Sequence, residues 1–228
     1  MDNSNGILDI LKKLLTKQKR LILISSDPNE YKINDDVRNI TQEAFNMSGF
    51  NFEKVIMIDQ RNADKLSILI KEADLIILCG GHVPTQNNWF EKLKLKEILK
   101  KYNGIIVGQS AGSMNMAEIV YACPELEGEA KDPNYKRWIN GLGLTNINIF
   151  PHYEELEVEI LDGFKYIDIL LKDSFERKIH TLNDGSFIMV NADDITIYGD
   201  CYEIYKGIIT KICENNNIFK LINSDDND

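Results

Sequence analysis

Short, continuous apolar runs alternate with amphipathic segments along most of the chain. Such runs are typical of strands that are buried on both faces of a parallel sheet. They predict strands at residues 21–24, 55–58, 75–79, 104–107, 147–150 and 178–182. Apolar positions that recur every three or four residues predict helices at residues 7–15, 36–47, 63–71 and 89–101, and from Ala111 onward. Strands that alternate with helices favour right-handed βαβ units.

The pattern changes after Asp193, where short β-rich runs are separated by turn residues. These runs lie at residues 195–198, 202–205 and 207–212. We therefore expect an α/β fold, a three-layer sandwich with a mostly parallel sheet, and a β-rich C-terminal extension. No linker interrupts the pattern, so we expect a single domain over residues 1–222 and a flexible tail at 223–228.

Charge and composition narrow the classes of function. The 228 residues include 36 acidic and 26 basic side chains, a net charge of −10 that would repel a nucleic-acid backbone. The apolar runs are too short to cross a membrane, and no signal-like segment is present, so we expect a cytoplasmic protein without membrane or nucleic-acid partners. Four cysteines without CxxC spacing indicate buried, reduced thiols.

The sharpest chemical motif is Gly108-Gln109-Ser110-Ala111-Gly112, which follows one predicted strand and precedes a predicted helix. This is a G-x-S-x-G sequence in the context of a nucleophile elbow, where a sharp turn strains the serine and exposes its hydroxyl. The amide of Ala111 would face the oxyanion of a tetrahedral intermediate. A purely structural turn is the alternative interpretation.

Two further segments end predicted strands with groups that this chemistry needs. Gly80 and Gly81 follow the strand at 75–79 and could offer free amides as a second oxyanion donor. His152, in Phe150-Pro151-His152-Tyr153, follows the strand at 147–150 at the edge where a base would be required. A turn without a ligand and a structural histidine are the corresponding alternatives.

These three elements together resemble the serine peptidase family of dipeptidase E and cyanophycinase, which has a class I glutamine-amidotransferase-like fold. Members carry a Gly-rich strand end, then a G-x-S-A-G elbow, then a Pro-His-aromatic segment. Here Ser110 follows Gly81 by 29 residues, and His152 follows Ser110 by 42. The resemblance extends from about residue 20 to about residue 190.

The resemblance implies that Ser110 is the nucleophile, His152 the general base, and the amides of Gly81 and Ala111 the oxyanion hole. Three carboxylates compete for the third place in the triad. Asp184 follows the strand at 178–182, Glu154 lies two residues after His152 as in amidotransferases, and Glu125 lies 15 residues after Ser110 as assigned in dipeptidase E. We favour Asp184, with Glu154 second and Glu125 third.

The leading hypothesis is a serine hydrolase that cleaves a small peptide or amide through an acyl-enzyme, with a homodimer left open. A non-catalytic member of the same fold that binds a small molecule or a partner protein is the alternative. Amidotransferase chemistry is disfavoured because those enzymes use cysteine where Ser110 stands. Gln109 and His82 depart from the pattern of dipeptidase E, so its aspartyl-dipeptide preference does not carry over. The histidines lack metal-binding spacing, and no metal or cofactor is expected.

Overall fold

The computed structural model describes residues 3–156, 158–192 and 194–221. Contacts divide the chain into two compact units. Unit 1 contains Leu8–Ala122 and Trp138–Asn146, and unit 2 contains residues 3–7, Cys123–Arg137 and the chain from Ile147 onward. Each unit is described by itself, and the expectation of a single domain stays a prediction.

Unit 1 is built on a four-stranded parallel sheet with the strand order β2-β1-β3-β4. Its strands are β1 (Arg20–Ile24), β2 (Lys54–Ile58), β3 (Leu75–Leu78) and β4 (Ile105–Gly108). Each lies within a residue or two of the strand that the apolar runs predict. The sites that follow β3 and β4 are neighbours, because Leu78 pairs with Gly108 at the carboxyl ends of these strands. The two central strands, β1 and β3, are buried on both faces, which explains their continuous apolar runs, whereas the edge strands β2 and β4 are only partly buried.

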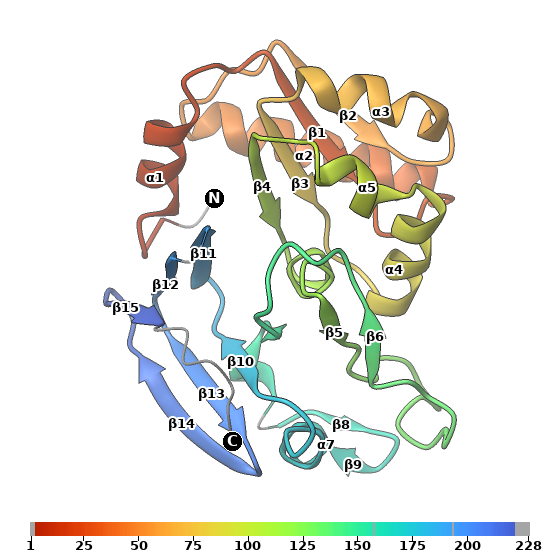
Figure 1. The fold of residues 1–228 in the computed structure, drawn as a ribbon, viewed down its shortest axis with the longest axis vertical. Coiled ribbons are helices and arrows are strands. Elements are labelled where there is room, and N and C mark those ends of the chain that lie inside the picture. The colour runs from red at the N-terminus through yellow and green to blue at the C-terminus, as the bar shows by residue number, and fades with distance from the viewer. Residues whose placement is uncertain (1–2, 157, 193, 222–228) are drawn as a thin grey trace. The chain divides into compact units, whose positions relative to one another are not determined.

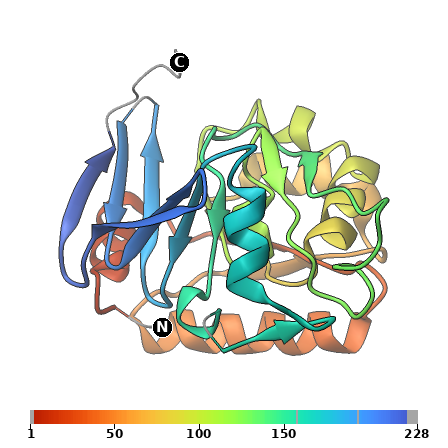
Figure 2. The ribbon, with the colours of Figure 1, turned by 90° about the horizontal axis from the view of Figure 1, so that it is seen from below.

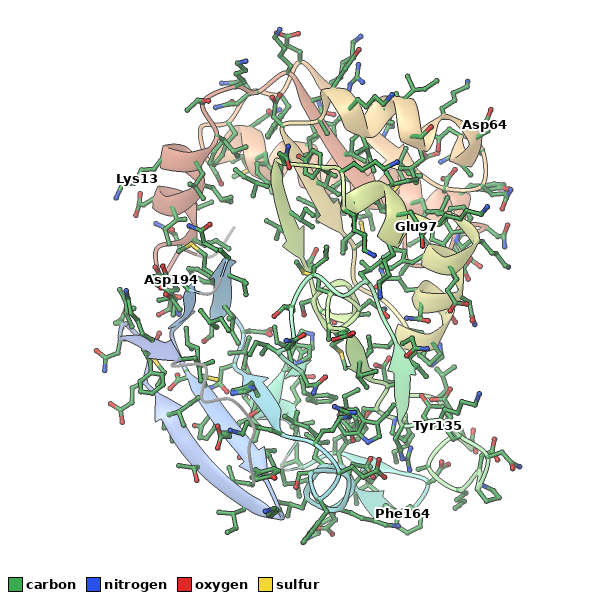
Figure 3. The ribbon with its side chains drawn as sticks, in the orientation of Figure 1. Lys13, Asp64, Glu97, Tyr135, Phe164 and Asp194 are labelled. Carbon is green, nitrogen blue, oxygen red and sulfur yellow. The ribbon has the colours of Figure 1, made fainter. Side chains whose placement is uncertain are left out.

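Helices cover both faces of this sheet, and the expected α/β fold is confirmed. They are α1 (Ile7–Leu14), α2 (Tyr31–Met47), η1 (Ala63–Lys65), α3 (Leu66–Leu69), η2 (Ile70–Glu72), α4 (Val83–Lys92), α5 (Leu95–Leu99) and α6 (Ala111–Met114). One core cluster joins apolar residues of β1 and β3 to α3, α4 and α5. Figure 2 shows α2 along the opposite side of the sheet, and Figure 3 shows charged side chains such as Lys13 and Asp64 at the surface.

Several helix boundaries differ from the predictions. The helix predicted from residue 36 begins at Tyr31, and the helix predicted at 89–101 is two helices, α4 and α5. They are separated by Lys94, whose left-handed φ of 52° interrupts the helical path. The helix expected from Ala111 ends at Met114, and strand β5 (Ile119–Tyr121) follows and pairs with β6 (Trp138–Asn140).

Unit 2 is rich in β-structure, as the C-terminal pattern predicts (Figure 1). A mixed sheet has the order β14-β13-β10-β7, with β7 (Ile149–Phe150), β10 (Ile179–Leu182), β13 (Cys201–Tyr205) and β14 (Ile208–Cys213). A second, antiparallel sheet contains β11 (Phe187–Asn191), β12 (Asp194–Tyr198) and β15 (Ile218–Leu221). The remaining elements are η3 (Tyr153–Glu155), the hairpin of β8 (Ile160–Leu161) and β9 (Phe164–Lys165), and α7 (Tyr166–Asp173).

The cysteines are buried, as their spacing indicates. Cys79, Cys123, Cys201 and Cys213 are all buried and unbridged. Burial raises the pKa of the Cys79 thiol to about 12, so this side chain is protonated at neutral pH. Within the described part of the chain, none of the helices combines the length and apolarity needed to span a membrane.

Candidate active site

Ser110 lies in a strained turn between β4 and α6. Its φ of 49° and ψ of −121° are outside the regions that non-glycine residues ordinarily adopt. The strained backbone that the G-x-S-x-G motif predicts is therefore confirmed. The neighbouring glycines are required by space: a Cβ on Gly112 would overlap the carbonyl oxygen of Leu78, and one on Gly108 would lie 2.5 Å from the Cα of Ser113.

The turn places Ser110 beside the glycine pair that follows β3. A Cβ built on Gly80 would lie 3.2 Å from the Cβ of Ser110 and 3.8 Å from its Oγ. Gly81 has a φ of 153° and lies against the side chain of Ser26, which leaves no room for a side chain at this position. Ala111 is buried at the start of α6. Unit 1 thus places Ser110 beside Gly80, and the predicted oxyanion donors Gly81 and Ala111 are the residues that directly follow these two.

His82 follows the glycine pair at the carboxyl end of β3, and an ion pair of the buried Asp59 follows β2 in the same sheet. His82 is the N-cap residue of α4, and its Nδ1 lies 2.8 Å from Thr85 Oγ1. This local contact agrees with a loop histidine. After β2, the fully buried Asp59 accepts hydrogen bonds from Arg61, whose guanidinium also binds Asp35. The guanidinium at this edge is thus already paired with two carboxylates.

In unit 2, His152 forms a hydrogen bond with one of the three candidate carboxylates. Its Nδ1 lies 2.7 Å from Asp184 Oδ1. Since a carboxylate can only accept, Nδ1 carries the proton and Nε2 is the basic nitrogen of the neutral ring. The imidazole side chain is 44% exposed and the carboxylate 67% exposed. Their contact therefore orients the ring more than it stabilises the fold.

The side chain of Glu154 supports this pair by binding the main chain of Asp184. Its Oε1 accepts a hydrogen bond of 2.9 Å from the backbone N–H of Asp184. The turn that follows depends on Gly185, whose φ of 81° is costly for any residue with a side chain. His152 itself has a left-handed φ of 60° at the start of η3. Asp184 thus contacts His152 through its side chain and Glu154 through its backbone.

Glu125 lies in a different loop, where other acidic groups surround it. Its backbone N–H donates to Glu129 Oε2. Partial burial of its carboxyl, together with repulsion from Glu129 and Glu159, raises the pKa of Glu125 to about 7. These contacts tie Glu125 to an acidic loop of unit 2 and give it a different environment from Asp184.

The predicted site residues fall into two groups. Ser110, Gly81 and Ala111 belong to unit 1, whereas His152 and the three carboxylates belong to unit 2. His180, expected to be a strand residue, is buried in β10, and its pKa is lowered to about 4, mainly by burial. Among the described residues, no group of three or more His, Cys, Asp or Glu side chains could hold a metal ion.

Sequence reasoning missed three buried amides in unit 1. Gln86, Asn87 and Asn115 are 0%, 7% and 0% exposed. A signal for two of them was available, because Val83, Gln86, Asn87 and Phe90 follow the i, i+3, i+4, i+7 spacing of a buried helix face. Amides on such a face require hydrogen-bond partners inside the protein.

The fold is that of an α/β protein with a parallel sheet flanked by helices and further β-rich sheets. A crystal structure described as a candidate peptidase E from Listeria monocytogenes EGD-e aligns with a TM-score of 0.54 and 12% identity, over 93% of this chain and 96% of the other. At this identity the likeness concerns the fold alone. The chain belongs to peptidase family S51, whose model matches residues 2–198. The family resemblance drawn from the motifs is thus confirmed, although no curated protein gives a significant match.

Proposed function

We propose that this member of family S51 is a serine-type hydrolase that cleaves a small peptide or amide through an acyl-enzyme. The observation that carries the proposal is the strained backbone of Ser110 beside Gly80. A non-glycine residue adopts such a conformation at a cost of about 1–3 kcal/mol, and in a G-x-S-x-G turn this strain exposes the hydroxyl for attack.

In the proposed reaction, Ser110 Oγ attacks the carbonyl carbon of the scissile bond while His152 Nε2 accepts the hydroxyl proton. The negative charge that develops on the carbonyl oxygen is held by the amides of Gly81 and Ala111. The carbon–nitrogen bond then breaks, and the imidazolium returns the proton to the leaving amine. Water, deprotonated by the same imidazole, hydrolyses the ester on Ser110.

Asp184 would orient the imidazole in this reaction. The hydrogen bond from Nδ1 to Asp184 selects the tautomer whose Nε2 can accept a proton, and the carboxylate stabilises the imidazolium as it forms. Glu154 would act indirectly, by holding the backbone of Asp184 in its turn. This geometry favours Asp184 over Glu154 and Glu125 as the third member of the triad.

Labelling with a fluorophosphonate probe tests the proposal. The wild-type protein should be modified stoichiometrically at Ser110, as read by mass spectrometry of the labelled peptide, and Ser110→Ala should not be modified. Ser67→Ala removes an exposed hydroxyl elsewhere in unit 1 and should keep the label on Ser110. Cys79→Ala should also be labelled, because the Cys79 thiol is protonated and buried. A wild-type protein that takes up no label would favour the non-catalytic alternative.

A further inference from the structure

Three buried amide side chains in unit 1 form a continuous chain of hydrogen bonds. Gln86 Nε2 donates to the carbonyl oxygen of Cys79 at 2.6 Å. Asn115 Nδ2 donates to Gln86 Oε1 at 3.0 Å, and Asn87 Nδ2 donates to Asn115 Oδ1 at 2.9 Å. The hydrogen-bond chain therefore runs from Asn87 on α4, through Asn115 after α6 and Gln86 on α4, to the carbonyl of Cys79 directly after β3.

Main-chain carbonyls fix the direction of this chain. Each of the three amides also points its NH₂ group at a backbone carbonyl, which can only accept a hydrogen bond. For Gln86 this carbonyl is Cys79, for Asn115 it is Val83, and for Asn87 it is Asn140. The side-chain oxygens must then face the neighbouring NH₂ groups. Each hydrogen bond between two amides consequently points toward Cys79, while the NH₂ groups of Asn115 and Asn87 also bind Val83 and Asn140.

The end of the chain is the peptide bond that joins Cys79 to Gly80. A hydrogen bond accepted by the Cys79 oxygen increases the polarity of the whole peptide, including the N–H that belongs to Gly80. Successive hydrogen bonds that point the same way reinforce one another in a buried, low-dielectric environment. Gly80 is the residue that lies against Ser110.

The middle of this hydrogen-bond chain is tied to the serine turn. Asn115 directly follows α6, the short helix that begins after Ser110, and its backbone N–H donates to Ala111. Asn115 and Gln86 together thus connect the turn that carries Ser110 with the loop that carries Gly80 and Gly81. We propose that Gln86, Asn115 and Asn87 are positioning residues, which hold the Cys79–Gly80 peptide and the oxyanion loop in register with Ser110. This inference rests on the proposed function.

Removal of the last link provides the most direct test. Gln86→Met keeps the length of the side chain but deletes the donor to Cys79. We expect the rate of fluorophosphonate labelling at Ser110 to fall about 10- to 100-fold, less than the about 10²- to 10³-fold loss that follows complete removal of an oxyanion donor. Reversible binding of the probe, from the concentration dependence of the rate, should change little. The ¹⁵N–¹H resonance of Gly80 should move in the same variant, since it reports the polarity of this peptide without any need for activity.

Two variants serve as controls. Asn62→Asp alters another amide of unit 1 that joins two main-chain groups, Met57 and Asp59, and should leave the labelling rate and the Gly80 resonance unchanged. Gln86→Glu, assayed at about pH 5.5, should restore the rate relative to wild type at the same pH, because burial raises the pKa of a carboxyl and its protonated O–H can donate to Cys79. Should Gln86→Met not fold, Asn87→Ala, the outermost link, should lower the rate about 2- to 5-fold.

The outcomes separate the two proposals. Labelled wild type with a slowed Gln86→Met and a shifted Gly80 resonance supports the positioning role. If wild type is labelled and Gln86→Met reacts at the rate of Asn62→Asp, the positioning role is wrong and the proposed function stands. If wild type takes up no label at Ser110, the proposed function fails, and the positioning role for that reaction fails with it.

Discussion

The two halves of the candidate site are held in place by different physical means. In unit 1, Ser110 is fixed by its own main chain, in a turn where Gly108 and Gly112 have no space for a side chain. In unit 2, His152 and Asp184 are fixed by a side-chain hydrogen bond between groups that are 44% and 67% exposed. Steric exclusion and burial therefore determine the first half, and hydrogen bonding in contact with water determines the second.

Because of this difference, mutations in the two halves should have different effects on stability and activity. Changes in the serine turn should lower stability and activity together, because the same packing holds the turn and the end of β3. Changes in the histidine pair should lower activity alone, because exposed ion pairs contribute only about 0–1 kcal/mol to the free energy of unfolding. The comparison can be tested in each half by one substitution.

The largest expected effect is that of Asp184→Asn on activity. An amide at this position can donate to Nδ1 and so favours the tautomer whose Nε2 carries the proton and cannot act as a base. We expect the rate of Ser110 labelling to fall about 10³-fold, equivalent to about 4 kcal/mol, while the midpoint of urea unfolding stays within experimental scatter.

Glu154→Gln is the matched control for Asp184→Asn. Its side-chain oxygen can still accept the hydrogen bond from the backbone of Asp184, so we expect a loss of about tenfold or less. If Asp184→Asn reacted normally and Glu154→Gln did not, the pairing of His152 with Glu154 known from amidotransferases would replace the present assignment.

Gly112→Ala should have the next largest effect, and it concerns stability. The added Cβ would overlap the carbonyl oxygen of Leu78, a main-chain atom of β3 that cannot move without disturbing the sheet. We expect a loss of about 3 kcal/mol in the free energy of unfolding, together with loss of labelling. Gly163→Ala in unit 2 adds a Cβ in open space at a φ of 88° and should cost only about 1 kcal/mol. Equal costs in urea titrations would contradict the steric account of the serine turn.

The sequence predicts the parallel sheet well because its central strands, β1 and β3, are buried on both faces. Continuous apolar runs identify β1 to β4 to within a residue or two, and their order along the chain places Gly80 and Ser110 at strand ends. The strain at Ser110 is also predictable, since G-x-S-x-G between a strand and a helix has few other conformations.

The sequence is a poorer guide where structure depends on long-range contacts. Short strands such as β5 and β8 have two or three residues and too little periodicity to be distinguished from loops or helix. The break between α4 and α5 depends on the left-handed backbone of Lys94. A glycine at this position would indicate such a break in the sequence, but a lysine does not. Gln86 and Asn115 are 29 residues apart, and nothing local to either indicates that their side chains meet. The choice among three carboxylates depends in the same way on which loop lies beside His152.

Glu125→Gln should have the smallest effect and tests the remaining carboxylate. Partial burial and the neighbouring Glu129 and Glu159 raise the pKa of Glu125 from 4.5 to about 7, so between these values the folded protein retains a proton that the unfolded chain has released. Stability therefore falls as the pH rises through this window, and the glutamine variant lacks this loss.

After allowance for solvent screening we expect Glu125→Gln to be about 1 kcal/mol more stable than wild type at about pH 8 and equal to it at about pH 4. Urea titrations at both values measure this difference, with the exposed Glu127→Gln as a control that should show none. The rate of Ser110 labelling should be unchanged, because Glu125 lies in the acidic loop and Asp184 holds the imidazole. A loss of about 100-fold or more in this variant would instead assign Glu125 to the triad.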